Sequence, residues 1–456
     1  MTANDILDRF SRAIPVAVMA RGLVEHLFSP QTLNAIPNGV QLFTYTRSID
    51  FAQLVSLMGD VVFRVHPSVR AAYRKSPEAQ SAATLKSFYE KFNRMEPNVC
   101  RAFVRQLSQR CADVAAAWEP TAPALVPGLR MRILDGNKLA ATERRLDGLE
   151  KVLAPLPGQA LVLQDFATGL FVDVLPWEDA YTNERALFGH LKDWWQADDL
   201  IVADCNFCTE SLLRPIQSAG AFFAIRHHSG VGLHPLDAEI FVGRNASGEI
   251  FEQRVRYAQS DLELRCTIVR LDEPTRDGDR EIRILTNLLP TQADALLVAE
   301  IYRKRGGIEN GFQELEAALR SEIATLAYPK AALFGFCMGL VLCNLFQVIR
   351  AATAKVPEAP KPEKISGVLL GQEIATYLGA LLLLDLPTNY PQAEWTAKEM
   401  AEWLLRIASR IDWRNYRKSP RGPKKKKEVG SYPRASPHEA TARVLAERSK
   451  KRKNAP

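Results

Sequence analysis

The sequence is poor in the residues that build disulfide frameworks and metal clusters. Its seven cysteines are odd in number and scattered over 456 residues, which argues against a disulfide framework and favours a reducing compartment. Cys205 and Cys208 have the spacing of half a zinc site, but no second CxxC or nearby pair of histidines completes it. His227 and His228 are likewise too few to indicate a metal site. These residues therefore do not predict a zinc site.

Long apolar runs are also scarce. Acidic residues stand near the N-terminus where a signal peptide needs a basic region, so we expect no export signal and a cytoplasmic location. Residues 331–348 are the one stretch that suggests a membrane span, but they contain Asn344 and Gln347 and are barely long enough. The preferred interpretation is a buried core helix, with no membrane partner. A composition of 47% hydrophobic and 24% charged residues is typical of a globular protein.

Positive charge is concentrated at the C-terminal end. Residues 414–456 contain fifteen Lys or Arg and three Glu, whereas residues 1–413 contain 44 basic and 49 acidic residues. A basic tail on a neutral-to-acidic body suits a polyanion, because lysine and arginine neutralise phosphates whatever the base sequence. Nucleic acid is the preferred partner, and a solubilising tail is the alternative. The predicted phosphate contacts here are Arg421, Lys424, Lys425, Lys426 and Lys427.

The first 120 residues are predicted to be mostly helical. Residues 76–96 combine capping residues, helical apolar spacing and the basic residues Lys86, Lys91 and Arg94. They predict one helix, either the DNA-contacting recognition helix of a helix-turn-helix-like unit or an ordinary amphipathic helix. The proline-rich segment 119–128 then marks a domain boundary.

A mixed α/β pattern follows this boundary. Residues 129–137 alternate in polarity as a strand does, and two more strands flank a turn at 166–169. A helix over 181–196, an apolar strand ending at Asp204, another helix and another strand complete the series. Short connections predict antiparallel pairing among the first three strands, and the later crossovers predict parallel pairing. Residues 229–290 contain short strands and turns, which predict a β-rich insertion.

Two aspartates stand at the ends of predicted strands. Asp135 follows apolar same-face neighbours in the first strand, and Asp204 ends the buried strand. Two acids held at strand ends are costly to ionise side by side unless a cation compensates, and Mg²⁺ prefers carboxylate and phosphate oxygens. Two metals about 4 Å apart can activate water or a 3′-hydroxyl for phosphoryl transfer. Asp165 and Asp173 lie in the same region and compete as ligands, and a turn or a helix cap is the plain alternative for each acid.

The segment from Tyr302 to Glu322 predicts one charged helix ahead of the apolar run. Tyr302, Arg305 and Glu309 fall within about 60° of one another on its face. Taken alone, this spacing indicates a solvated face with an i,i+4 ion pair. If the helix faces the strand ends, Glu309 supplies a third carboxylate.

This helix resembles the catalytic signature of the DDE transposases of the bacterial insertion-sequence-four family. That family carries Y-(2)-R-(3)-E-(6)-K, and here Tyr302, Arg305 and Glu309 match, with Glu316 in the place of the lysine. The segments "RILDGN" and "VADCNF" resemble those around the family's two catalytic aspartates, and the "PRGPKKKK" tail is similar too. The resemblance covers the chain from about residue 20 to the tail.

The resemblance implies a ribonuclease-H-like core that cuts DNA at transposon ends and joins them to a target. In this core Asp135, Asp204 and Glu309 would bind two Mg²⁺ ions, for which Mn²⁺ can substitute. Tyr302 and Arg305 would contact DNA phosphates, which suits a planar bidentate donor. The implied partner is double-stranded DNA, both terminal inverted repeats and target. It would be bound by a homodimer in the paired complex, associated with the bacterial nucleoid.

Two departures from the family pattern matter. Glu316 reverses the charge of the expected lysine, so one DNA contact is lost or replaced, for which Arg320 is the candidate. Some relatives stack a flipped base on a tryptophan of the insertion, but no Trp lies between 205 and 394, which leaves Tyr257 or Phe251. The competing functions are a catalytically inactive or regulatory DNA-binding relative, which Glu316 favours, and a Mg²⁺-dependent nuclease without strand transfer.

The predicted fold class is α/β: a ribonuclease-H-like mixed sheet core with a β-rich insertion, a helical N-terminal domain and a helical, basic C-terminal region. The predicted domains are a helical DNA-binding domain (1–120), the first part of the core (128–228), the insertion (229–290), the completion of the core (291–352), a helical domain (353–416) and a basic tail (417–456).

Overall fold

The computed structural model describes residues 3–40, 48–118, 124–258, 260–275, 278–384, 394–419 and 438–453. Part of the predicted linker lies outside these residues. The five predicted contacts of the basic tail, from Arg421 to Lys427, lie outside them as well.

The N-terminal part of the chain is helical, as its sequence predicts. Ser29, Asp50, Ser68, Ser76 and Thr84 each cap a helix by accepting a hydrogen bond from a backbone N–H of its first turn. The helices are α1 (Ala3–Ala13), α2 (Pro15–Leu27), α3 (Pro30–Asn38), α4 (Phe51–Val62), α5 (Val69–Lys75), α6 (Pro77–Ala82), α7 (Leu85–Asn93) and α8 (Pro97–Ala116).

The single helix predicted over 76–96 is wrong. Ala83 is extended, with φ −168° and ψ 172°, and Thr84 caps a new helix. Two short helices, α6 and α7, therefore stand where one was expected. Periodicity favoured a continuous helix, but two N-cap residues eight positions apart divide it.

A mixed ten-stranded sheet runs through the protein in the order β4-β3-β1-β5-β6-β11-β10-β9-β7, with β8 also paired to β9. Strand β1 pairs antiparallel with β3 and parallel with β5, and β5 pairs parallel with β6, so the predicted pairing is confirmed. The strands are β1 (Arg130–Lys138), β3 (Gln159–Asp165), β4 (Phe171–Trp177), β5 (Asp199–Ala203), β6 (Phe222–Arg226), β7 (Leu233–Pro235), β8 (Ile240–Asn245), β9 (Gly248–Tyr257), β10 (Glu263–Leu271) and β11 (Glu281–Thr286).

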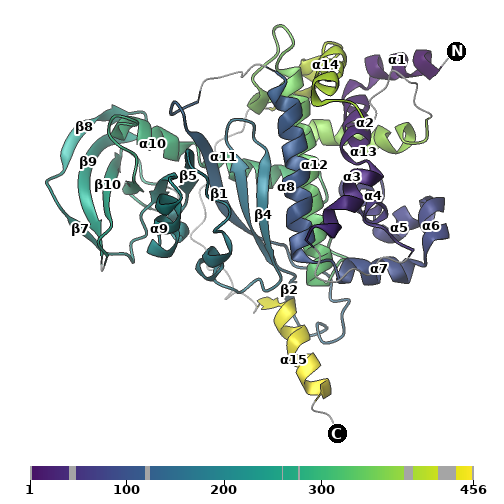
Figure 1. Cartoon of the computed structure of the whole chain (residues 1–456), viewed down its shortest axis with the longest axis horizontal. Coiled ribbons are helices and arrows are strands. Elements are labelled where there is room, and N and C mark those ends of the chain that lie inside the picture. Colours follow the sequence, from purple (N-terminus) through teal and green to yellow (C-terminus); the bar gives the residue numbers. More distant parts are fainter. Residues whose placement is uncertain are drawn as a thin grey trace.

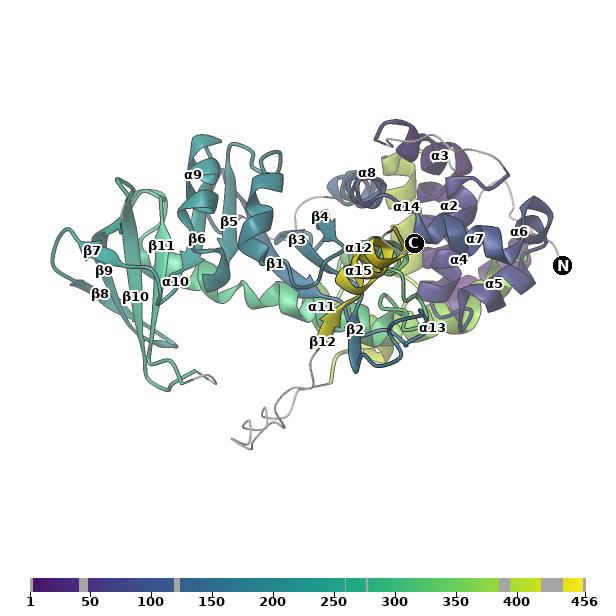
Figure 2. The ribbon, with the colours of Figure 1, turned by 90° about the horizontal axis from the view of Figure 1, so that it is seen from below.

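The predicted insertion strands continue the core sheet. Strand β11 pairs antiparallel with β6, so β7 to β11 extend the sheet away from the helical part of the molecule (Figure 2). The helix predicted over 181–196 is only a short 3-10 helix, η1 (Glu184–His190). Another 3-10 helix, η2 (Cys205–Phe207), and helix α9 (Glu210–Ser218) connect β5 to β6.

A long apolar helix forms the centre of the molecule. Helix α12 (Pro329–Thr353) is long and apolar enough to cross a membrane, with a mean hydropathy of 2.1, but 94% of its apolar stretch is buried. It lies beside α8, between the strands and the N-terminal helices (Figure 1). Its polar Asn344 accepts a hydrogen bond from the backbone N–H of Phe171 (2.8 Å) and donates one to the carbonyl of the same residue (2.9 Å). The predicted core helix is thus present, and its buried amide fastens it to β4.

The remaining elements surround this helix. Helices α10 (Ala295–Arg303) and α11 (Gly306–Ala318) precede it in the chain. After it come η3 (Pro362–Lys364), α13 (Gly367–Leu381), α14 (Ala397–Ala408) and η4 (Trp413–Tyr416). A small second sheet pairs β2 (Ala154–Leu156) with β12 (His438–Ala440), and α15 (Thr441–Lys453) follows β12.

Candidate active site

The two predicted catalytic aspartates lie in neighbouring strands. Asp204 directly follows β5, but the prediction that Asp135 ends its strand is wrong, because β1 continues to Lys138 through its pairing with β3. Strands β1 and β5 are parallel neighbours in which Ile133 stands opposite Val202, and each aspartate follows two residues later. Asp135 accepts a hydrogen bond from the N–H of Gly136 (2.9 Å). Asp204 caps η2 by accepting one from the N–H of Asn206 (2.8 Å). The sheet register therefore brings the two carboxylates together, as the sequence predicts.

Arg305 joins the third predicted acid to Asp135. Its guanidinium lies 3.3 Å from a carboxylate oxygen of Asp135 and 2.5 Å from one of Glu309. Asp135 and Arg305 are 170 positions apart in the chain. The i,i+4 ion pair expected of a solvated face is thus present, and its arginine also contacts Asp135 within β1.

The single helix predicted from Tyr302 to Glu322 is wrong. Helix α10 ends at Arg303 and α11 runs only from Gly306 to Ala318, because two glycines follow Arg305 and stabilise a helix poorly. At the junction the backbone makes i→i+3 hydrogen bonds, from Arg305 N–H to the Tyr302 carbonyl and from Gly307 N–H to the Lys304 carbonyl. This tighter turn carries Arg305 between the two helices.

Burial and charge make the site costly to ionise. Burial raises the pKa of Asp135 to about 7; Arg305 opposes this shift, and the carboxylates of Asp204 and Glu309 add to it. Tyr302 is half-buried beside the same groups, and burial raises the pKa of its phenol. A carboxyl group that is hard to ionise between other acids gains from a nearby cation. Here Arg305 is that cation.

The donor set fits a hard divalent metal ion in its chemistry. The three predicted ligands offer only carboxylate oxygens, and they meet where one of them is hard to ionise. Among the residues that the structure describes, however, no three His, Cys, Asp or Glu side chains are arranged to hold a metal ion. Arg305 lies between Asp135 and Glu309, so these carboxylates would have to release it to share a metal.

The sequence did not single out Glu184, another acid near Asp204. Its carboxylate lies against the backbone of β1, and a Cβ added to Gly136 would be only 2.3 Å from its Oε1 atom. Burial raises the pKa of Glu184, and the charge of Asp204 raises it further. Glu184 lies in a 3-10 helix, and no spacing pattern in the sequence could have identified it.

The predicted DNA-contacting residues lie in different surroundings. Lys86 and Arg94 are exposed on and just after α7, but the ammonium group of Lys91 donates to the backbone carbonyl of Ile49 (3.2 Å). Glu316 is exposed on α11. Arg320, its predicted substitute, donates to the carbonyl of Pro67 (2.7 Å) and so fastens the chain after α11 to the N-terminal helices.

Neither proposed base-stacking residue presents a free ring. Tyr257 is 7% exposed, and its hydroxyl donates to the Cys208 carbonyl. Phe251 is covered by the Arg270 guanidinium, 4.2 Å from its ring centre, and by Phe241. Tyr257 therefore serves the core of the sheet.

The two competing aspartates serve structural roles. Asp165 accepts hydrogen bonds from Arg132 and Thr168, which closes the turn after β3. Asp173 is 4% exposed and accepts hydrogen bonds from Arg101 and Arg105 of α8. These bonds fasten α8 to β4 and leave neither acid at the candidate site.

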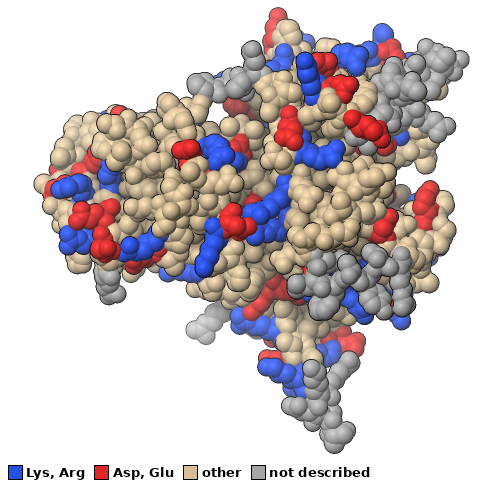
Figure 3. Space-filling view, in the orientation of Figure 1, with Lys and Arg blue, Asp and Glu red and all other residues tan. Residues whose placement is uncertain are grey.

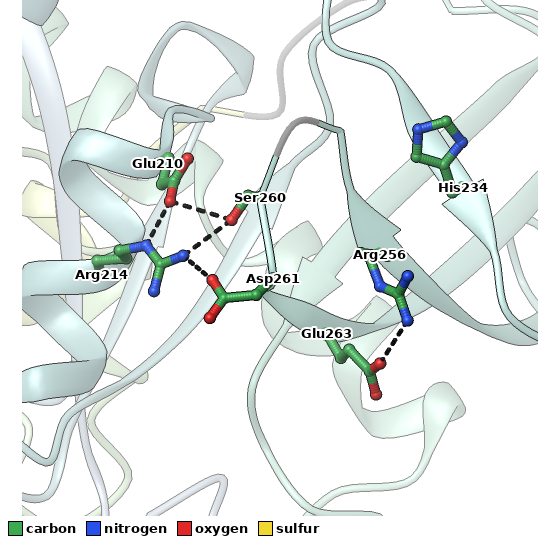
Figure 4. A pocket seen from close by; sticks show the side chains of 7 residues that line it. All are labelled: Glu210, Arg214, His234, Arg256, Ser260, Asp261 and Glu263. Atoms are coloured by element: carbon green, nitrogen blue, oxygen red, sulfur yellow. Dashed lines mark hydrogen bonds and ion pairs between the residues drawn. The ribbon is translucent and has the colours of Figure 1, made fainter.

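A hollow of about 610 Å³ lies away from these acids, between α9 and the insertion strands (Figure 4). Arg214 bonds to Glu210, Ser260 and Asp261, and Arg256 pairs with Glu263 (3.0 Å). Its lining charges are thus largely paired with one another, so the hollow gives no sign of a charged ligand.

Comparison with known proteins gives one match to a family model, over part of the chain. Residues 159–345 match the model of the transposase DDE domain, a segment that includes Asp204 and Glu309. No curated protein matches the sequence. Among solved structures, a cryo-EM structure of a piggyBac transposase synaptic complex with hairpin DNA aligns with 88% of this chain and 86% of that chain, at 11% identity and a TM-score of 0.40.

Proposed function

We propose that this protein is a DNA transposase of the DDE type, similar to those of the bacterial insertion-sequence-four family. It would bind transposon ends, cut the DNA there and transfer the cut strands to a target. The observation that carries the proposal is the ion pairing of Arg305 with both Asp135 and Glu309, next to the strand that Asp204 directly follows. The match of residues 159–345 to the transposase DDE domain supports it.

Asp135, Asp204 and Glu309 are the proposed catalytic carboxylates and ligands of Mg²⁺. They would hold two ions, and Mn²⁺ can replace them. When bound, the metal would activate a water or 3′-hydroxyl and stabilise the leaving oxygen of an in-line displacement. The carboxylates would hold the reacting groups at the end of a rigid sheet, which keeps their geometry fixed.

Arg305 is the proposed phosphate contact beside these acids. Its side chain is 18% exposed, so its guanidinium faces the site from a largely enclosed position. A planar guanidinium binds a phosphate through two parallel hydrogen bonds, which fixes the orientation of the backbone. Tyr302, half-buried beside it, would limit where that phosphate can sit.

The proposed partner is double-stranded DNA, as terminal inverted repeats and as target. Two copies of the chain would pair the two ends, and the protein would act in the cytoplasm on the bacterial nucleoid. Lys86, Lys91 and Arg94 in the N-terminal helices and the basic residues 421–427 remain proposed DNA contacts. The carbonyl contact of Lys91 means that this residue would have to exchange an internal bond for a phosphate.

An in-vitro cleavage assay tests the proposal. Wild type, Glu309→Gln and the control Glu402→Gln, an equal charge change at an exposed residue of α14, are given Mg²⁺ and DNA with the ends of the encoding element. We expect end-specific cuts and strand transfer from wild type and control only, with DNA binding within a few-fold for all three. Cuts without end specificity or transfer would indicate a nuclease. Binding without cuts by any protein would favour the regulatory alternative that Glu316 suggests.

A further inference from the structure

The last described segment of the chain is attached to the catalytic part of the molecule. Strand β12 pairs in parallel with β2, and Ala440 and Thr441 are buried where the strand passes into α15. The helix then projects from the body below β2 (Figure 1). The C-terminal residues 438–453 therefore have a fixed place relative to the sheet.

The ring of Tyr181 lies between a basic side chain of this helix and one of β1, the strand that carries Asp135. The Arg443 guanidinium lies 5.6 Å from the ring centre of Tyr181, and the ammonium group of Lys138 lies 5.7 Å from the same centre. Arg443 is also held by the carboxylate of Asp179 (2.8 Å). Lys138 stands three residues after Asp135 in β1, which is about 10 Å along a strand. Helix α15 thus begins at a ring that also contacts the strand carrying Asp135.

Charge is unevenly distributed along α15. Near its start Arg443 pairs with Asp179, and in its middle Arg448 lies 4.0 Å from Asp147. Further out, Lys450 and Lys451 are exposed, with no ion pair to any residue that the structure describes. The sequence continues with Arg452 and Lys453. Lysine and arginine side chains lie on this projection together with acidic ones (Figure 3). The net positive charge is therefore concentrated on its outer turn.

We propose that α15, which the pairing of β12 with β2 holds in place, binds the phosphate backbone of the duplex that enters the candidate active site. The inference rests on the proposed function and names the surface that would hold the DNA next to the cut. Thirteen helical residues span about 20 Å, and α15 begins at the ring that Lys138 of β1 also contacts, so the outer lysines would reach phosphates within about two turns of DNA, roughly 70 Å, from the cleaved bond. Charge complementarity selects the partner, because exposed lysines without an ion pair complement the closely spaced phosphates of duplex DNA.

A binding experiment with paired charge reversals tests this inference. The full-length chain is compared with K450E/K451E and with the control K398E/R406E, which makes the same charge change on exposed residues of α14, at the opposite end of the molecule (Figure 1). Binding to a 40-bp duplex is measured by fluorescence anisotropy at several salt concentrations without divalent metal. We expect K450E/K451E to weaken binding about tenfold and to lower the salt slope by about two, because two phosphate contacts are lost. The control should keep the wild-type slope.

A photo-crosslinking amino acid at position 447 of α15 then locates the DNA. Crosslinks within about two helical turns of the cleaved bond would support the inference. The inference would be overturned if wild type binds the duplex and K450E/K451E binds it as the control does. Crosslinks that map farther from the cleaved bond would also overturn it. Either result would leave the proposed function standing. Wild type that does not bind duplex DNA at all would overturn both.

Discussion

Asp60 is a half-buried carboxylate whose ionisation should affect stability. It lies near the C-terminal end of α4, and its carboxylate has no hydrogen-bond or ion-pair partner among the described residues. Burial raises the pKa of Asp60 from 3.8 to about 6. The C-terminal end of a helix also disfavours a negative charge. We predict that Asp60→Asn stabilises the protein at neutral pH.

The sign and size of the effect follow from this shift. Because the folded state binds the Asp60 proton more tightly than the unfolded state does, its contribution favours folding at low pH and is lost as pH rises through 4 to 6. At pH 7.5 the ionised carboxylate costs about 3 kcal/mol, and at pH 5 about half of that. The amide carries no charge, so Asp60→Asn should remove this cost.

Thermal unfolding between pH 5 and pH 8 measures the difference. For 456 residues unfolding together, 3 kcal/mol corresponds to a rise of about 3 °C in Tm at pH 7.5. The rise should fall by about half at pH 5. The exposed Glu402→Gln is the matched control and should leave Tm unchanged at both pH values. A gain from Asp60→Asn that is equal at pH 5 and pH 8 would refute the titration argument and point to a new hydrogen bond of the amide.

Two further predictions concern buried polar contacts of α12. Asn344→Leu leaves the backbone N–H and carbonyl of Phe171 without partners and should lower the free energy of unfolding by about 2–4 kcal/mol, measured by urea denaturation. A loss below about 1 kcal/mol would mean that water replaces the amide. Arg350→Met leaves Glu314, whose side chain is 10% exposed, buried beside α12 without its ion pair, and should cost about 3–5 kcal/mol in the same measurement. Adding Glu314→Gln should restore part of that loss, and no recovery would indicate that packing dominates.

The sequence predicts the sheet strands well because alternation along a strand is a local property. The parallel pairing of β1 with β5, and with it the meeting of Asp135 and Asp204, follows from strand order and connection length. Glu309 could be assigned because its i,i+4 spacing from Arg305 and the resemblance agreed. The sequence does not predict the contact between Arg305 and Asp135, because this contact depends on how α11 packs against the sheet.

Other features depend on tertiary contacts that no spacing reveals. Glu184 lies near Asp204 only because η1 folds over the end of β1. The sequence predicts Asp173 as a competing metal ligand, but its carboxylate pairs with Arg101 and so attaches α8 to the sheet. The break between α10 and α11 could have been anticipated from the two glycines after Arg305, but the charged spacing suggested continuity. Long-range packing therefore determines the surroundings of Glu184 and Asp173, whereas the helix break has a local cause.

The continuous sheet has a mechanical consequence for the arm formed by β7 to β11. Strand β6 is hydrogen-bonded both to β5, which Asp204 directly follows, and to β11, so the sheet itself joins the arm to the strand beside the acids. With about 4.8 Å between neighbouring strands, β9 stands roughly 20 Å from β5. The sheet therefore keeps the arm at a set distance from Asp204, and under the proposed function DNA resting on β9 would be held at that distance from the bond to be cut.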